Sequence, residues 1–156
     1  MYIPEIPNNI RITEEIKKII SIAKAMEGIK RFSFNAPSTE MEILEVEQAI
    51  NSSLPDEYKD ILRFANGLTL NGFTVDFYNT SEIINNYFEE KEESFPDEYV
   101  IIGETIGDGE ILCFSKTTEK FIRFFNGEEV IYETFKDVLN WMIRFIERID
   151  EEYLYE

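Results

Sequence analysis

The sequence has no histidine and only one cysteine, Cys113, among its 156 residues. Without histidine, a Ser/His/Asp or Cys/His catalytic site and a histidine-containing zinc site are excluded. One cysteine can form neither an internal disulfide nor an all-cysteine metal site, so any catalysis would have to use carboxylates, lysine or tyrosine. A secreted chain of this size more often has paired cysteines. We therefore expect a cytoplasmic protein in which Cys113 is a small buried apolar residue.

Basic residues are also few: 15 Lys and Arg stand against 32 Asp and Glu, which gives a net charge of −17. This charge repels phosphate backbones and anionic lipid surfaces, so we expect no nucleic-acid and no membrane partner and favour a basic protein partner. An acidic surface that only aids solubility is the alternative. The sequence has no apolar run long enough for a membrane span. Its hydrophobic content of 44% is high enough for one folded domain.

The first half of the chain has the apolar spacing of helices. We predict a first helix capped by Thr13 and stopped by Gly28, and a connector over residues 31–37. A capping box of Thr39 and Glu42 predicts a second helix that ends near residue 51, and a third follows from residue 55 to 65. We divide the chain into an N-terminal helical extension, residues 1–37, packed on a main domain, residues 38–156.

The second half changes to the alternating pattern of strands. Turn-forming residues separate the β-rich runs, and such short links favour an antiparallel meander. A closing helix from residue 134 carries an apolar stripe that should cover one face of the sheet. The chain therefore predicts an α+β fold, with a largely antiparallel sheet flanked by N-terminal helices and a closing C-terminal helix. The predicted strands are residues 73–77, 99–102, 110–115, 120–125 and 129–134, with a brief helical turn at 81–88.

Three groups of motifs occur in order along residues 38–147, and we interpret their residues as structural. A helix start is followed by an Asn-Gly break, then by an Ile-Gly pair with a glycine-rich turn, then by the closing helix that begins at Thr134. The motif residues of the first two groups are Leu54, Pro55, Tyr58, Lys59, Asn66, Gly67, Ile102, Gly103, Gly107 and Gly109. In combination they resemble the SUKH superfamily, which contains bacterial immunity proteins and yeast regulators of cell-wall assembly and glucan synthesis.

This resemblance implies a single α+β domain with a mixed or antiparallel sheet. It also implies one of two roles. Many bacterial members bind and neutralise a cognate toxin, often a nuclease, whereas eukaryotic members act as regulators or scaffolds.

Acidic residues are concentrated in residues 81–110, which contain ten of them and one base, Lys91. Carboxylates there could steer and pair with basic residues of a toxin. An apolar patch near Phe73, Phe77 or Phe124 would supply the desolvated centre of the interface. The residues that we expect to contact the partner are Glu104, Asp108, Glu110, Glu92, Glu93, Asp97 and Phe124.

Other interpretations of these residues remain open. Residues 89–98 could be only a solvated acidic loop. Asp76, Asp108 and Glu110 could bind magnesium or calcium through oxygen ligands, although glycines beside an acid are ordinary in hairpins. Residues 55–59 have the residue types of a nuclease site, but a helix start explains them. Most of the aromatic side chains fit a core better than a platform for stacking bases: Phe114, Phe121, Phe124, Phe125, Tyr132, Phe135, Trp141 and Phe145.

We therefore predict a non-enzymatic immunity protein, with no cofactor and no metal, that blocks the active site of a basic protein toxin. The first alternative is a regulatory scaffold of the same fold that binds a cellular protein. The second is a metalloenzyme that depends on carboxylates.

Overall fold

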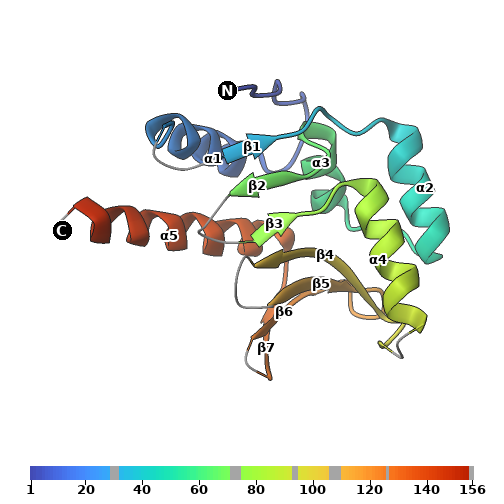
Figure 1. Ribbon diagram of the computed structural model, residues 1–156. Coiled ribbons are helices and arrows are strands. Elements are labelled where there is room, and N and C mark those ends of the chain that lie inside the picture. Colours follow the sequence, from blue (N-terminus) through green and yellow to red (C-terminus); the bar gives the residue numbers. More distant parts are fainter. Residues whose placement is uncertain (29–31, 71–74, 93–94, 106–109, 126, 155–156) are drawn as a thin grey trace.

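The structure of the chain is a computed structural model that describes residues 1–28, 32–70, 75–92, 95–105, 110–125 and 127–154 (Figure 1). These residues form five helices and seven strands. In chain order they are α1 (Thr13–Ala25), β1 (Phe32–Phe34), α2 (Glu40–Ile50), α3 (Asp56–Phe64), β2 (Leu68–Leu70), β3 (Val75–Phe77), α4 (Thr80–Glu92), β4 (Tyr99–Thr105), β5 (Ile111–Ser115), β6 (Phe121–Phe125), β7 (Glu128–Tyr132) and α5 (Phe135–Leu154).

The seven strands form one sheet in which each strand pairs antiparallel with its neighbours in the sequence, in the order β1 to β7. The predicted α+β fold and antiparallel meander are confirmed. In its described part the sheet has one irregularity: the register of β4 against β5 shifts between Ile101 and Gly103, as in a β-bulge. A bulge places two residues of one strand opposite one residue of the other, which reverses the side-chain alternation beyond it.

Two of the predicted helix starts are confirmed. Thr39 and Glu42 form the reciprocal hydrogen bonds of a capping box at α2. Thr134 and Asp137 do the same at the start of α5. The predicted cap of α1 is wrong, because Thr13 is already inside the helix and its hydroxyl donates to the carbonyl of Ile10.

Two strands of the structure were not predicted, and one helix is longer than predicted. The predicted connector contains β1, whose Phe-Ser-Phe pattern alternates between buried and exposed. The strand β2 was not foreseen, since three residues are too short a run to show a clear period. The helix α4 extends to Glu92, so the acidic residues from Glu89 to Glu92 are helical and the predicted loop is wrong there. Reciprocal hydrogen bonds between Asn79 and Glu82 start this longer helix.

The helix α5 covers one face of the sheet, as predicted. Its first residue, Phe135, is buried, and its ring centroid lies 5.3 Å from that of Tyr58, 5.5 Å from that of Phe77 and 5.3 Å from that of Phe121. The predicted core aromatics Phe114, Phe121 and Phe135 are buried, and Tyr132, Trp141 and Phe145 are partly buried against the core. One aromatic cluster thus joins α3, the sheet and α5.

The remaining helices pack in pairs beside this core. The N-terminal helix α1 lies along α5 at one end of the molecule, and α2 lies beside α4 at the other (Figure 1). Residues 1–37 also contribute β1 to the sheet, through its pairing with β2. The domain boundary after residue 37 stays a prediction. In the part of the chain that the structure describes, no helix has the length and apolar composition needed to cross a membrane.

Candidate functional site

The strands β4 to β7 have one face against α5 and a second face, which we call the outer face. Register places four apolar residues side by side on the outer face, one from each strand: Ile101, Cys113, Ile122 and Ile131. The first three are buried, whereas Ile131 is 56% exposed. The outer face therefore has a small apolar centre of its own that opens to solvent at β7.

Aromatic residues also lie on the outer face. The rings of Tyr99 and Phe124 lie edge to face with centroids 5.4 Å apart, and the ring of Phe95 lies 6.1 Å from that of Tyr99. Phe124 is the residue of the predicted contact set that the structure places on this apolar centre. Cys113 is fully buried, as predicted, and burial together with the charge of Glu90 raises the pKa of its thiol. The thiol therefore stays protonated and unreactive.

Acidic side chains lie on the outer face in the same row as Phe124. Because of the bulge, Glu104 lies opposite Ile111 and shares the outer face with it, directly beside Asp76 of β3. Burial raises the pKa of Asp76, although a hydrogen bond from the backbone N–H of Leu70 opposes the shift. The charges of Glu104 and Glu82 raise the pKa of Asp76 further. The outer face thus holds carboxylates close enough to repel one another.

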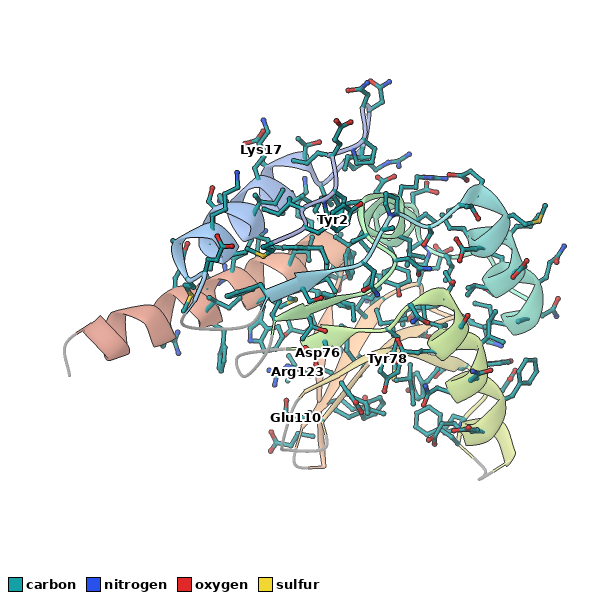
Figure 2. The ribbon with its side chains drawn as sticks, turned by 45° about the horizontal axis from the view of Figure 1, so that its top comes forward. Tyr2, Lys17, Asp76, Tyr78, Glu110 and Arg123 are labelled. Carbon is teal, nitrogen blue, oxygen red and sulfur yellow. The ribbon has the colours of Figure 1, made fainter. Side chains whose placement is uncertain are left out.

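The pKa values of two tyrosines near these acids are also raised. Burial, the charge of Glu104 and a hydrogen bond to Glu104 raise the pKa of Tyr78, which follows β3 beside Asp76 (Figure 2). Burial, Glu98 and the charge of Glu129 raise the pKa of Tyr99. Both hydroxyls therefore remain neutral hydrogen-bond donors at physiological pH.

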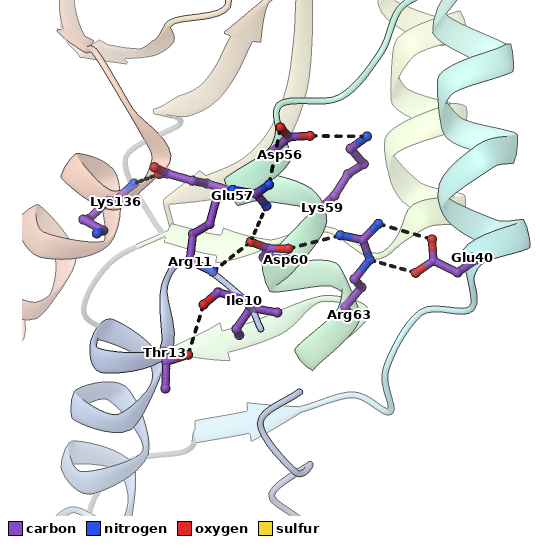
Figure 3. Close-up of polar contacts among 10 residues, drawn as sticks. All are labelled: Ile10, Arg11, Thr13, Glu40, Asp56, Glu57, Lys59, Asp60, Arg63 and Lys136. Atoms are coloured by element: carbon purple, nitrogen blue, oxygen red, sulfur yellow. Dashed lines mark hydrogen bonds and ion pairs between the residues drawn. The ribbon is translucent and has the colours of Figure 1, made fainter. Parts of the chain in front are cut away.

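The acids of the outer face differ from the acids elsewhere in the fold. Among the described side chains, no lysine or arginine forms an ion pair with Asp76, Glu104 or Glu129. Other acids are compensated internally, and Asp60 is the clearest case. It is 2% exposed and accepts from the backbone N–H of Arg11 and from both the Arg11 and Arg63 guanidinium groups (Figure 3).

Glu110 lies on the other side of the sheet from Glu104. It is 7% exposed, and one of its carboxylate oxygens lies 3.3 Å from Nη1 of Arg123 (Figure 2). The Arg123 guanidinium in turn stacks 4.4 Å from the ring centroid of Trp141 on α5. Glu110 is thus held in an internal ion pair, and it is not brought together with Glu104.

Asp97 also has internal partners. It accepts from the Tyr87 hydroxyl and pairs with Lys116 at 3.2 Å, and Lys116 Nζ also donates to the carbonyl of Ile50. Glu92 is the last residue of α4. The side chain of Glu92, together with Glu93 and Asp108, lies outside the described part of the structure.

Of the three residues expected near the apolar patch, Phe124 lies on the outer face. Phe77 is buried against Phe135, so it cannot reach a partner. Phe73 lies outside the described residues. The exposed apolar residue near Phe124 is instead Ile131. The alternation of β7 is visible in the sequence. Only the register of β6 and β7 shows that Ile131 lies on the same face as Phe124.

The motif at the start of α3 lines a cavity of about 630 Å³ together with the β5–β6 turn and the start of α5. Leu54, Pro55 and Lys59 contribute to this lining. Tyr58 of the same motif is fully buried, and its hydroxyl has no hydrogen-bond partner among the described residues. Glu57 accepts from the backbone N–H of Lys136 at 2.8 Å and so joins α3 to α5 (Figure 3).

The Asn-Gly motif joins α3 to α4. The Asn66 side chain exchanges hydrogen bonds with the backbone N–H and the hydroxyl of Thr80. Gly67 has a φ of +89°, and a Cβ there would lie 2.9 Å from the backbone nitrogen of Asn79. Ile102 is buried, and Gly103 lies at the bulge of β4. Gly107 and Gly109 lie outside the described residues.

The residues that the sequence offers as metal ligands lie in separate parts of the fold. Lys59 pairs with Glu47 and Asp56 at the helix start, each at 3.6 Å. Asp76 lies on the outer face, whereas Glu110 faces Arg123. Within the described residues, no group of three or more His, Cys, Asp or Glu side chains is placed to hold a metal ion.

Comparison with known proteins agrees with the motifs. The model of the SMI1/KNR4 family (SUKH-1) matches residues 37–141, which is more than half of the chain and runs from the start of α2 into α5. No curated protein matches the sequence. The matched span contains the motifs around Leu54, Asn66 and Ile102 and the strands of the outer face. The chain therefore belongs to the SMI1/KNR4 family (SUKH-1).

Proposed function

We propose that this protein is a non-enzymatic immunity protein, which binds a cognate toxin through the outer face and blocks the toxin's active site. Family membership supports this, because the family includes toxin immunity proteins. The observation that carries the proposal is the outer face itself, where Asp76, Glu104 and Glu129 lack ion pairs within the described structure and lie in one row across the sheet with Phe124.

The physical basis is the cost of holding the Asp76 carboxylate charged at this place. Burial is the main cause of its raised pKa, and repulsion from Glu104 and Glu82 raises the pKa further, so the charged form is destabilised in the free protein. A lysine or arginine of a toxin would relieve this repulsion, and the negative field would also speed the encounter. The rings of Tyr99 and Phe124 supply apolar area at the centre, where desolvated aromatic contacts contribute most to affinity.

A basic active-site groove is the surface that such a face fits. A nuclease has such a groove, since its substrate is polyanionic. Carboxylates seated there occupy the positions of substrate phosphates, so inhibition is stoichiometric and needs no catalysis by the immunity protein.

The test begins with capture of partners from the source organism on the tagged full chain, at low and moderate salt. Captured proteins are identified by mass spectrometry and expressed alone to score toxicity. A basic protein that kills in the absence of this chain, and whose capture weakens with salt, supports the proposal. Capture of only housekeeping or envelope-synthesis proteins would replace it with the scaffold function.

Charge reversal then locates the interface. We expect Glu104→Lys/Glu129→Lys to weaken toxin binding by about a hundredfold, mainly through slower association and loss of two charge pairs. The control Glu5→Lys/Glu45→Lys changes the net charge equally at exposed positions on the N-terminal segment and α2. Equal effects of the two double variants would show that net charge, and not the outer face, drives binding.

A further inference from the structure

We propose that the free edge of β7 binds an extended basic segment of the partner as an eighth strand of the sheet. The basic nature of that partner is taken from the proposed function. The edge itself is a separate feature, because β7 is the last strand of the sheet and pairs on one side only, with β6, in the described structure. A strand edge of this kind offers backbone N–H and C=O groups to a further strand.

The side chains of β7 divide into two pairs along the strand. Glu128 and Glu129 are exposed neighbours at its start, and Val130 and Ile131 follow. On the outer face, Glu129 lies opposite Phe124 and Ile131 lies opposite Ile122, so an added strand would extend the outer face directly. The edge therefore presents two acids and then two β-branched residues.

This pattern selects the chemistry of the added strand. Side chains directly opposite each other in paired strands stabilise the pairing when they are of opposite charge or both apolar, and like charges destabilise it. The matching segment has two basic residues opposite Glu128 and Glu129, and two apolar residues opposite Val130 and Ile131. In an antiparallel arrangement it reads apolar-apolar-basic-basic.

A second copy of the chain does not meet these requirements. Two antiparallel β7 strands centred on Val130 would place Glu129 opposite Ile131 and Glu128 opposite Tyr132. Neither acid would gain a cation, and both chains carry a net charge of −17. Exposed charges on an edge strand are a common protection against such self-pairing. The occupant that fits is therefore a basic segment of another protein.

The probe is the peptide acetyl-Thr-Val-Val-Lys-Lys-Thr-amide, titrated into the isotopically labelled full chain and followed by NMR. A control peptide with the second valine replaced by proline has the same charge but cannot form the ladder. We expect the probe to shift the amide signals of β7 and to slow their hydrogen exchange by about tenfold. The proline peptide should bind about tenfold more weakly.

Protein variants provide the second arm. We expect Glu128→Lys/Glu129→Lys to weaken the probe about tenfold, whereas the matched control Glu5→Lys/Glu45→Lys changes it by about twofold or less. Equal binding of the two peptides, or signal changes centred away from β7, would overturn the inference.

The two proposals fail separately. If the captured toxin binds the chain but leaves the β7 amides unprotected, the edge inference is wrong and the immunity function stands. If no toxin is captured but the probe protects β7, the edge inference stands and the immunity function is wrong.

Discussion

The carboxylate of Asp60 should be the strongest single polar attachment of the N-terminal segment, and its removal tests this directly. It is 2% exposed and receives the backbone N–H of Arg11 at 3.0 Å and the guanidinium groups of Arg11 and Arg63 at 3.1 Å each (Figure 3). Arg63 has a second partner, because it binds both carboxylate oxygens of Glu40. Asp60→Ala therefore affects mainly the residues just before α1.

The loss of unfolding free energy in Asp60→Ala depends on which hydrogen-bond donors can be hydrated once the carboxylate is removed. The Arg11 side chain is 54% exposed, so its guanidinium rehydrates and contributes about 0.5 kcal/mol. The Arg11 backbone N–H loses a charged acceptor, for which about 1.5–2 kcal/mol is typical. With a further contribution of about 0.5 kcal/mol from Arg63, we expect Asp60→Ala to lower the free energy of unfolding by about 2.5–3 kcal/mol. Asp60→Asn retains one acceptor oxygen and should cost about half of this.

Urea unfolding followed by Trp141 fluorescence measures the loss, and hydrogen exchange of the Arg11 amide locates it. The matched control is Asp56→Asn, since Asp56 is 67% exposed and lies 3.7 Å from Arg11. That exposed pair should contribute less than about 0.5 kcal/mol. An Asp60→Ala variant as stable as Asp56→Asn, with unchanged protection of the Arg11 amide, would refute the reasoning.

Three further substitutions test the motifs and the outer face. Gly67→Ala should lower the unfolding free energy in urea by more than about 2 kcal/mol, because φ is +89° and a Cβ would contact backbone, whereas a Cβ at Gly28 meets no described atom within 4 Å and Gly28→Ala should cost about 1 kcal/mol. Tyr58→Phe removes a buried hydroxyl that has no partner in the described part of the chain, and it should be neutral or stabilising by up to about 1 kcal/mol in the same assay. Because the pKa of Asp76 is raised, the native state binds more protons between the ordinary value of 3.8 and the raised value, so stability falls as pH rises through that window. Glu104→Gln should reduce this fall, and equal pH profiles for the variant and the wild type would contradict the coupling.

Much of the fold could be predicted because it depends on local signals. The capping residues Thr39 and Thr134 start helices independently of the rest of the fold, since their hydrogen bonds span only three residues. Short turns between β4, β5, β6 and β7 leave antiparallel pairing as the available topology. The strands β1 and β2 were missed for the converse reason. Each has three residues, and the pairing of Phe32 with Leu70 joins positions far apart in the sequence.

The positions of the candidate contact residues could be predicted less well, because they depend on register. Glu104 and Glu110 belong to the same acidic segment, yet the bulge and the strand alternation put them on opposite faces of the sheet. Composition cannot show that Arg123 neutralises one of them. Glu129 and Ile131 were not singled out because they join the outer face only through the pairing of β7 with β6.

The motifs of the family and the proposed contacts of the partner therefore have different positions, but β4 connects them. Ile102 and Gly103 lie at the irregularity of β4, and the next residue, Glu104, is turned by it to the outer face. The motif determines the face to which the side chain at position 104 points. It does not determine which residue type stands there, because Glu104 is exposed and has no role in the core. Substitutions at Glu104, Glu129 and Ile131 should then change which protein is bound while the unfolding free energy changes by less than about 1 kcal/mol. A thermal or urea melt of a triple variant at these positions would show a large loss if the outer face were instead needed for folding.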